Sequence, residues 1–397
     1  MNSRGVLNIG LFGFGTVGRG LYDVLEETKL KEAHIKRVCV RDITKDRGVK
    51  AEFTDNPDEI FNDPEINLVV ELIDDAEASY TIVKRALEAG IPVVTGNKKM
   101  LAYHLEELIE IQREKQVPLL YDASACGSIP VIRNLEEYYD NDLLTSVKGI
   151  LNGSSNFILS KIFNENMSYP AALCLAQDLG FAESDPSLDI DGFDSLFKLI
   201  IITMHAFGRY VSPDDIFVYG ISHMNDDDIR FATEKKRRIK LVAHVEKLNN
   251  GKMIMSVMPH LISRDKYIYS VEDEFNGVVI KGKFYDKQVM FGRGAGGHPT
   301  GSAVLSDIMA CFYNYRYEYK RMIGRTPVEY TDDVLVRVYL RYSNAEDRAL
   351  FEFDSIEEQY ISNDYKYLVG HISLANLHKI AAQIRERNLF IAAYPTK

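Results

Sequence analysis

The sequence contains few cysteines, no apolar run of membrane-spanning length and fewer basic than acidic residues. Its four cysteines lie far apart and form no C-x-x-C pair, which argues against a disulfide framework and a cysteine metal site. The longest apolar stretch, 196–207, is interrupted by Lys198 and His205 and does not read as a membrane span. The N-terminal segment holds a glycine-rich turn where an export signal would have an apolar core. These absences predict a cytoplasmic, reduced protein.

The acidic charge balance excludes one class of partner. A formal net charge of −11, from 47 Lys and Arg against 58 Asp and Glu, argues against nucleic-acid binding. With 397 residues, 46% hydrophobic content and only 26 Gly and 12 Pro, the chain can build two or three packed domains. The histidines show no metal-ligand spacing, and we interpret the basic run 235–238 as a solvated helix face.

The first 125 or so residues alternate short apolar runs with amphipathic stretches. Such an alternation predicts a doubly wound parallel sheet with helices on both faces and right-handed crossovers. The expected strands are 7–12, 37–40, 68–73, 92–95 and 118–121, and the expected helices are 17–31, 79–89 and 105–115.

From about residue 145 the pattern becomes that of an α+β domain with an antiparallel sheet. The most apolar helix is 193–207, and a helix over 229–244 is expected to pack beside a strand. Segments 267–271 and 277–284 are expected to form a hairpin broken at Asn276-Gly277. The remaining expected elements are strands at 147–151, 252–258 and 334–342 and helices that end near 163 or span 171–178, 302–311 and 374–387.

A G-x-G-x-x-G string follows the first strand and opens the first helix. Gly13 permits a tight turn, Gly15 lets the backbone approach a pyrophosphate, and Gly18 lets the helix pack closely on the strand. The helix N-terminus then offers free N–H groups and a partial positive charge to the phosphates. The string predicts a dinucleotide site made by Gly13, Phe14, Gly15, Thr16, Val17 and Gly18.

Two further segments are expected to meet the cofactor. Arg41 at the end of the second strand suits a 2′-phosphate and favours NADP, whereas the adjacent Asp42 could bind the ribose of NAD. Lys98, in the string T-G-N-K, follows a strand that ends beside the cofactor and could contact the nicotinamide side or a substrate carboxylate. A surface lysine is the plain alternative for that position.

The block 180–198 has the composition of a catalytic site. Asp194 and Lys198 stand four residues apart, so they share one face of an otherwise apolar helix. Burial lowers the pKa of a lysine and a nearby carboxylate raises it, which lets the group exchange a proton. Lys198 is therefore the candidate acid–base for interconverting an alcohol and an aldehyde. The alternative is a surface acidic loop beside an ordinary buried salt bridge.

Six strings follow one another in a fixed order: G-F-G-T-V-G at 13–18, T-G-N-K at 95–98, D-A-S-A-C-G-S-I-P at 122–130, G-I-L-N-G-S-S-N-F-I at 149–158, G-F-A-E-S-D-P-S-L-D-I-D-G-F-D at 180–194 and G-R-G-A-G-G-H-P-T-G-S-A-V at 292–304. Together with Lys198 they resemble the homoserine dehydrogenase family over roughly residues 7–325.

The resemblance implies NAD(P)-dependent interconversion of L-homoserine and L-aspartate 4-semialdehyde, in threonine and methionine biosynthesis, by a homodimer or homotetramer. It implies that Glu183 and Asp194 hold the substrate beside the backbone of Gly180, with Asp189 in support. It also implies a monovalent cation, Na⁺, bound by Asp122, Ala125, Gly127 and Ile129.

Two positions depart from the family pattern. Asp122 stands where the family usually has Glu, and its shorter side chain reaches less far towards a cation. Gly96 stands where many members have Ala. The glycine-dense segment 292–297 could be only a polar turn, but we expect Gly296 to lie beside the cofactor.

We predict the fold class α/β: a Rossmann-type doubly wound parallel sheet plus an α+β catalytic and dimerisation domain and a small C-terminal βα module. The NAD(P)-binding domain is 1–135, the catalytic and dimerisation domain is 136–325, and the module is 330–397. The helix at 300–325 is expected to return towards the nucleotide domain, and the Tyr/Arg-rich segment 312–325 is the expected boundary.

The tail has the length of an ACT-type regulatory domain, which in many members binds an end-product amino acid. It lacks the D-x-P-G-x-L turn, and the corresponding residues 343–350 read S-N-A-E-D-R-A-L. We interpret the tail as a degenerate or truncated module, with a role in dimerisation, and expect no inhibition by threonine.

Two other functions compete with homoserine dehydrogenase. The first is a related reductase of another amino-acid semialdehyde or a 3-hydroxy acid. The pairing of Glu183 with Asp194 argues against it, because these carboxylates suit a substrate with a free ammonium. The second is a catalytically silent NADP-binding regulator, and the presence of Lys198 beside both carboxylates argues against that.

Overall fold

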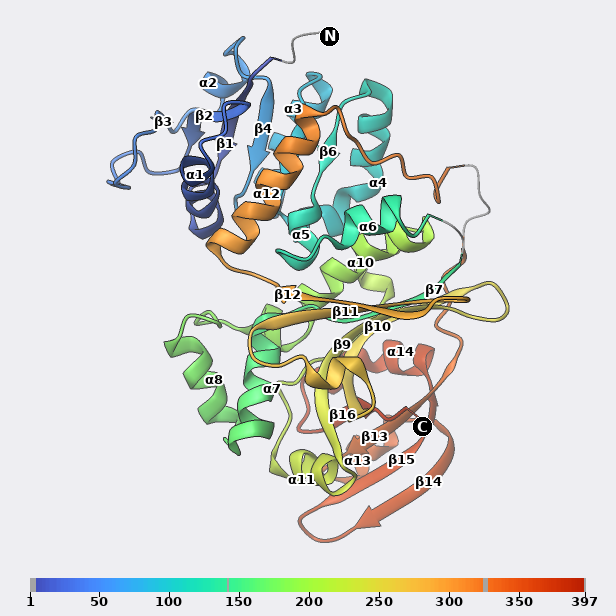
Figure 1. The fold of residues 1–397 in the computed structure, drawn as a ribbon. Coiled ribbons are helices and arrows are strands. Elements are labelled where there is room, and N and C mark those ends of the chain that lie inside the picture. Colours follow the sequence, from blue (N-terminus) through green and yellow to red (C-terminus); the bar gives the residue numbers. More distant parts are fainter. Residues whose placement is uncertain (1–4, 141–142, 324–327, 396–397) are drawn as a thin grey trace. The chain divides into compact units, whose positions relative to one another are not determined.

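The computed structural model describes residues 5–140, 143–323 and 328–395. The chain forms two compact units (Figure 1). Unit 1 contains Met1–Asp140 and Arg293–Ile323, and unit 2 contains Asn141–Gly292 and Gly324–Lys397. The chain therefore leaves unit 1 once and returns to it. The expected boundary 312–325 extends into 324–327, which lie outside the described residues.

Unit 1 is built on a six-stranded sheet in the order β3-β2-β1-β4-β5-β6, and every neighbouring pair is parallel. The order reverses at β1, as in a doubly wound sheet, so the predicted Rossmann-type architecture is confirmed. The short strand β3 was not predicted. The strands are β1 (Leu7–Phe12), β2 (Ala33–Cys39), β3 (Phe53–Thr54), β4 (Leu68–Glu71), β5 (Val93–Thr95) and β6 (Leu119–Leu120).

The helices of unit 1 include one from the returning segment. α12 lies along α1 (Figure 1), and glycines permit the close approach. A Cβ on Gly20 would lie 2.1 Å from the Gly297 oxygen, and one on Gly301 would lie 2.6 Å from the Gly20 carbonyl carbon. The helices are α1 (Thr16–Thr28), α2 (Asp58–Phe61), α3 (Ala76–Glu88), α4 (Lys98–Lys115), α5 (Asp122–Cys126), α6 (Val131–Glu137) and α12 (Gly297–Phe312).

Unit 2 is built on a ten-stranded sheet in the order β12-β11-β7-β9-β10-β16-β13-β15-β14, with β8 paired to β10. The pairs β7–β9, β9–β10 and β7–β11 are antiparallel, as predicted. The first strands are β7 (Leu144–Ile150), β8 (Phe217–Val218), β9 (Arg237–Lys247), β10 (Met253–Ser263), β11 (Phe275–Gly282) and β12 (Asp286–Arg293).

The central helix of unit 2 is α10 (Phe193–Phe207), with the predicted bounds. It packs against β7, β9 and β10, and fourteen of its fifteen residues are buried. Gly192 before it and Gly208 after it have φ of 92° and 67°, left-handed values that favour glycine. The other helices here are α7 (Gly153–Glu165), α8 (Tyr169–Asp178), α9 (Ser187–Ile190) and α11 (Asp226–Glu234).

Two predicted elements of unit 2 are wrong. The helix expected over 229–244 ends at Glu234, and β9 begins at Arg237 after Lys236 adopts φ 54°. The basic run is therefore not a helix face. Residues 267–270 form a 3₁₀ turn, and Asn276-Gly277 lies inside β11, so the hairpin turn comes between β11 and β12 instead.

The C-terminal βα module is more complete than the sequence predicted. Its order is β-α-β-β-α-β, a ferredoxin-like arrangement, so it is not truncated. Its sheet joins that of the catalytic segment at one parallel pair, His260 with Ala393. The elements are β13 (Leu335–Arg341), α13 (Ala345–Ala349), β14 (Phe353–Ile361), β15 (Lys366–Ser373), α14 (Leu374–Arg385) and β16 (Phe390–Ala393).

Candidate active site

The glycine turn of unit 1 has the geometry of a phosphate cradle. Gly13 has φ +93°, and a Cβ there would lie 2.6 Å from the Leu72 oxygen. A Cβ on Gly18 would lie 2.4 Å from the Gly13 oxygen, whereas Gly15 faces open space. Gly15 is also the N-cap of α1, and no side chain caps the helix. The first-turn N–H groups therefore suit a pyrophosphate, and the predicted residues fit a dinucleotide.

The end of β2 offers one cation and one carboxylate to the adenosine side of a cofactor. The Arg41 side chain is 86% exposed, and its Nη2 lies 3.7 Å from Oδ2 of Asp75. Asp42 accepts hydrogen bonds from the Thr44 hydroxyl at 2.6 Å and the Thr44 amide at 2.9 Å, and these bonds lower its pKa. Asp42 is thus engaged by its own turn, while Arg41 extends into solvent.

Lys98 is the first residue of α4, and a buried network fixes the turn before it. The Asn97 side chain caps the helix by accepting from the Met100 amide, and it donates to the Ile73 carbonyl at 3.0 Å. Thr95 donates from its hydroxyl to the Glu71 carboxylate at 2.6 Å. Glu71 is fully buried at the end of β4, and burial raises its pKa. No pattern in the sequence had pointed to Glu71.

Gly296 lies beside the glycine turn within unit 1. It is the N-cap of α12 and has φ +119°, a conformation that L side chains rarely adopt. A Cβ on its neighbour Gly297 would lie 2.9 Å from the Thr16 oxygen in the first turn of α1. The segment that the sequence assigned to the cofactor therefore does meet the dinucleotide motif.

Asp122 belongs to a buried charge cluster. Its Oδ1 accepts from the amides of Ile132 at 2.7 Å and Arg133 at 3.3 Å, and so caps α6. The Asp122 amide donates to Asp307 at 2.9 Å, and Arg133 forms an ion pair with Asp307 at 2.8 Å. Burial, and then the charge of Asp122, raise the pKa of Asp307 to about 7. The carbonyl of Ile129 already accepts from the Val131 amide at 2.8 Å.

Lys198 and Asp194 form a buried ion pair on α10. The Lys198 ammonium donates to Oδ2 of Asp194 at 2.7 Å and to the Leu151 carbonyl at 2.7 Å. The two side chains are 7% and 5% exposed. The predicted shared helix face therefore holds, and the carbonyl at the end of β7 is an additional partner that the sequence did not predict.

Asn152 joins the carboxylates of this site. Its Nδ2 donates to Oδ2 of Asp194 at 2.9 Å and to Oδ1 of Asp189 at 2.6 Å. Its Oδ1 caps α7 by accepting from the Ser155 amide at 2.8 Å. Burial, and then the charge of Asp194, raise the pKa of Asp189. The sequence left 152–156 open as a polar turn, although an Asn before a helix was a signal for the cap.

Gly180 and Glu183 lie on the loop after α8. Gly180 has φ +74° and nothing near its Cβ position. The exposed Glu183 accepts from Gln177 through its backbone carbonyl at 3.0 Å. Within the described residues, no hydrogen bond or ion pair joins the Glu183 carboxylate to Asp194 or Lys198. The hydrogen-bond network of the site therefore includes Asp189, Asp194 and Lys198, but not the Glu183 carboxylate.

A second buried lysine was missed by the sequence analysis. Lys240 of β9 donates to Oδ1 of Asn156 at 2.9 Å and to the Val271 carbonyl at 2.6 Å. Burial lowers its pKa to about 7. Asn156 also donates to the carbonyls of Val271, Asp273 and Phe275. This network ties the 271–275 loop to α7.

Two cavities of unit 2 contain none of the predicted site residues. One of about 230 Å³ is lined by Lys148, Lys266 and Lys281, and one of about 260 Å³ by Asn225, Arg341 and others. Among the described residues, no group of three or more His, Cys, Asp and Glu side chains is placed to hold a metal ion. In the same ranges, no helix is both long and apolar enough to cross a membrane.

A glycine turn that opens a helix beside a doubly wound sheet, and a buried lysine–carboxylate pair in a second unit, define a dinucleotide-dependent oxidoreductase. Known proteins agree with this class. The family model described as the homoserine dehydrogenase NAD binding domain matches residues 13–122, and the one described as homoserine dehydrogenase matches 130–309.

Curated relatives and solved structures extend the match. Homoserine dehydrogenases of Bacillus subtilis and Helicobacter pylori are each 35% identical, over 78% and 87% of this chain and 74% and 83% of theirs. The crystal structure of a homoserine dehydrogenase from Thiobacillus denitrificans has a TM-score of 0.83 at 29% identity and covers 98% of both chains. A hyperthermophilic archaeal homoserine dehydrogenase mutant in complex with NADPH has a TM-score of 0.68 at 28% identity, over 79% of this chain and 99% of its own.

The chain belongs to the homoserine dehydrogenase family. It is an oxidoreductase with an NAD-binding Rossmann domain that acts on a small-molecule substrate, and the predicted family, fold class and enzyme class are confirmed.

Proposed function

We propose that the enzyme reduces L-aspartate 4-semialdehyde to L-homoserine reversibly with NADPH, and that Lys198 is its acid–base. The observation that carries this role is the buried Lys198–Asp194 pair on an otherwise apolar helix. We assign the reaction to the cytoplasm and to the branch that leads to threonine and methionine. The bound nicotinamide supplies the hydride in reduction and accepts it in oxidation.

Lys198 moves the proton that accompanies the hydride. An ammonium has three N–H donors, and two of them bind Asp194 and the Leu151 carbonyl. The third donor is directed at the substrate oxygen. In reduction Lys198 protonates the alkoxide that develops when the carbonyl carbon gains hydride, and the neutral amine then regains a proton from water. In oxidation the amine takes the hydroxyl proton.

The carboxylates of α9 and of the first turn of α10 bind the amino-acid part of the substrate. Asp194 and Asp189 carry the negative charge that an ammonium needs, and Asn152 holds them in place. Glu183 and the backbone of Gly180 complete the site, and the exposed Glu183 side chain is free to swing onto the substrate. An ammonium beside Asp189 would lower the raised pKa of that carboxyl, since opposite charges favour ionisation.

NADP is the preferred cofactor in this proposal, with NAD as the weaker one. The glycine turn, Lys98 and Gly296 serve both dinucleotides, whereas Arg41 meets only the 2′-phosphate. The test is a cofactor-oxidation assay with L-aspartate 4-semialdehyde, run with NADPH and NADH in parallel. We expect a clear preference for NADPH, and equal rates with both cofactors would contradict the role of Arg41.

We further propose a bound monovalent cation, Na⁺, near Asp122, Ala125, Gly127 and Ile129. Oxygen ligands with one carboxylate suit such an ion, but the fit is incomplete. Asp122 already caps α6, and the Ile129 carbonyl already accepts a backbone hydrogen bond. No catalytic step is therefore assigned to the ion. Melting temperatures in NaCl, KCl and choline chloride at equal ionic strength test the proposal, because only a specific ion separates the three salts.

The assembly proposed here is a homodimer, with a homotetramer as the alternative. We assign 1–135 to NAD(P) binding, 136–325 to catalysis and dimerisation, with the helix at 300–325 returning to the nucleotide domain, and 330–397 to the C-terminal module. Light scattering coupled to size-exclusion chromatography distinguishes the two assemblies. A monomer at micromolar concentration would contradict both.

A further inference from the structure

The C-terminal module reaches the start of the catalytic helix through Arg385, on the last turn of α14. The guanidinium carbon of Arg385 lies 5.1 Å from the ring centre of Phe193, the first residue of α10. Its Nη2 donates to the Val218 carbonyl of β8 at 2.7 Å. Phe193 directly precedes Asp194, so this cation contacts the residue next to the lysine–carboxylate pair along the chain.

The segment after β8 connects the module to the turn before α10. The Ile221 amide donates to the Ile190 carbonyl at 2.7 Å. Gly220 lies so close to this turn that a Cβ would be 2.0 Å from the same Ile190 oxygen. Backbone therefore packs directly on backbone, and a shift of 218–221 must displace the turn 190–193 that joins Asp189 to Asp194.

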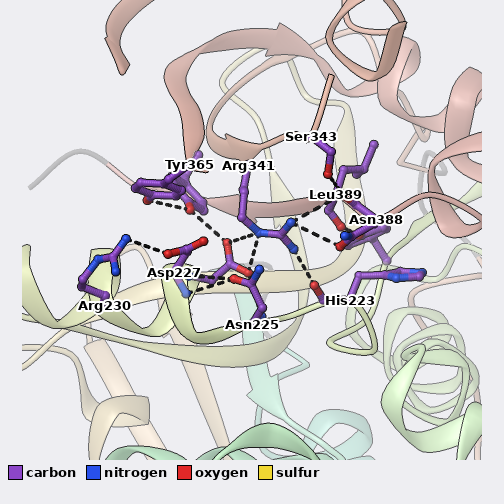
Figure 2. Close-up of polar contacts among 12 residues, drawn as sticks. His223, Asn225, Asp227, Arg230, Arg341, Ser343, Tyr365, Asn388 and Leu389 are labelled. Carbon is purple, nitrogen blue, oxygen red and sulfur yellow. Dashed lines mark hydrogen bonds and ion pairs between the residues drawn. The ribbon is translucent and has the colours of Figure 1, made fainter. Parts of the chain in front are cut away.

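A buried ion pair seats the module against the same segment. Nε of Arg341 donates to both carboxylate oxygens of Asp228 at 3.0 Å, and Nη2 donates to the His223 carbonyl at 2.6 Å. Figure 2 shows the Arg341 guanidinium with contacts to both His223 and Asn388. The His223 ring lies 2.7 Å from the Arg385 carbonyl. The module thus contacts the segment 218–223 at Val218 and at His223.

The guanidinium group of Arg385 is partly buried and so partly shielded from water. Burial lowers its pKa, and the nearby carboxylate of Asp191 opposes that change. A cation over an aromatic face gains more from the contact when water is excluded, and a hydrogen bond from a charged donor is stronger than a neutral one. The contact with Phe193 and Val218 is therefore strong enough to restrain the first turn of α10.

We propose that Arg385 is a positioning residue for homoserine binding, because it fixes the turn between Asp189 and Asp194 through Phe193 and Val218. This inference rests on the proposed role of those two carboxylates. Lys198 lies one helical turn farther along and, besides its bond to Asp194, is anchored by the Leu151 carbonyl outside this turn. The effect of Arg385 therefore falls on substrate binding and only weakly on proton transfer.

The test compares Arg385→Ala with Arg387→Ala in the full-length enzyme. Arg387 lies two residues farther along, and its Nη1 forms an ion pair with Asp347 inside the module at 2.9 Å. We expect Arg385→Ala to raise KM for homoserine about tenfold, as the loss of one desolvated cation–π contact and one charged hydrogen bond would. The kcat and the KM for NADP should change by less than about twofold. Arg387→Ala should lower the melting temperature and leave KM for homoserine unchanged.

A double-mutant cycle with Phe193→Leu sharpens the result. Leu keeps an apolar side chain but removes the aromatic face, so the effects of Phe193→Leu and Arg385→Ala on KM should be strongly non-additive. Arg385→Lys should recover part of the binding, because Lys keeps the charge but loses the planar group. If Arg385→Ala fails to fold, these two conservative variants still decide the question.

An unchanged KM in Arg385→Ala, or an equal rise in Arg387→Ala, would overturn the inference. Asp194→Asn measured in parallel separates this failure from a failure of the proposed site. If Asp194→Asn weakens homoserine binding while the Arg385 variants do not, only the positioning role is wrong. If Asp194→Asn leaves binding unchanged, the proposed substrate site is wrong.

Discussion

The two units hold their functional groups by different means. In unit 1 the proposed cofactor site is made of backbone, since a Cβ on Gly13 or Gly18 would lie 2.6 or 2.4 Å from a neighbouring backbone oxygen. In unit 2 the proposed substrate site is made of side chains that are far apart in the sequence, such as Asn152, Asp189 and Asp194. A backbone site is therefore sensitive to added atoms, and a side-chain site is sensitive to removed charges and hydrogen bonds.

The largest expected effect removes the charge at the centre of the side-chain site. Lys198→Ala should reduce turnover by about 10²- to 10⁴-fold, because the substrate oxygen loses its proton donor. NADPH binding, which belongs to unit 1, should be retained in a fluorescence titration. Lys161→Ala is the matched control, since Lys161 of α7 pairs with Glu165 at the surface of the same unit. Near-wild-type turnover in Lys198→Ala would exclude Lys198 as the acid–base.

Adding one carbon atom to the glycine turn should instead impair cofactor binding. Gly18→Ala would put a Cβ 2.4 Å from the Gly13 oxygen, so α1 must move away from the glycine turn. We expect NADPH affinity to fall by roughly tenfold or more and stability to fall by about 1–3 kcal/mol. Gly5→Ala is the control, because nothing lies within 4 Å of its Cβ position. Unchanged NADPH affinity in Gly18→Ala would show that the turn does not hold the phosphates.

The same difference explains what the sequence could predict. Short-range features were predicted well: β1 and α10 have the expected bounds, and the glycine string carries its own geometry. Asn152 and Lys240 were missed, because their partners lie 37 and 31 residues or more away along the chain. The helix expected over 229–244 was wrong for another reason. Apolar residues at 239, 241, 243 and 245 of β9 alternate with polar ones at 240, 244 and 246, so a strand signal was present and was overlooked in favour of a helix.

A more selective effect distinguishes the two cofactors within the backbone site. Arg41→Ala should weaken NADPH binding by about 10- to 100-fold, because a charge-assisted contact to the 2′-phosphate is lost. NADH binding should change by less than about twofold. Asp42→Ala is the complementary variant, and it should leave NADPH binding nearly unchanged because Asp42 is held by Thr44. Equal losses for both cofactors in Arg41→Ala would refute its role in selection.

The pH dependence of folding stability tests the buried Lys240 of unit 2. Burial lowers its folded pKa to about 7, below the ordinary value near 10.5, while Glu272 and Asp273 oppose the change. Between those values the unfolded chain binds a proton that the folded protein does not, so the stability contribution of Lys240 increases with pH. Relative to Lys240→Met, wild-type stability should rise by about 1.4 kcal/mol per pH unit from pH 7 towards pH 10. Urea unfolding at several pH values measures the difference, and parallel curves for the two proteins would contradict the lowered pKa.

The smallest expected effect concerns the C-terminal module. Residues 343–350 contain no Gly or Pro to form a ligand-binding bend, and their polar groups already serve the module itself. Asn344 caps α13, Asp347 is buried in its ion pair with Arg387, and Arg348 donates to the Phe351 carbonyl at 2.8 Å. Millimolar L-threonine should therefore leave the activity unchanged.

Deleting the module should instead reduce stability. Truncation near residue 330 removes β16 from the edge of β10 and leaves the buried Asp228 without Arg341. Removing the cation from a buried ion pair typically costs about 3–5 kcal/mol. A melting curve of the truncated enzyme measures that loss, and a threonine titration of the full-length enzyme is the matched experiment. Cooperative inhibition by threonine that disappears on truncation would show that the module is a working sensor and that its 343–350 turn binds a ligand after all.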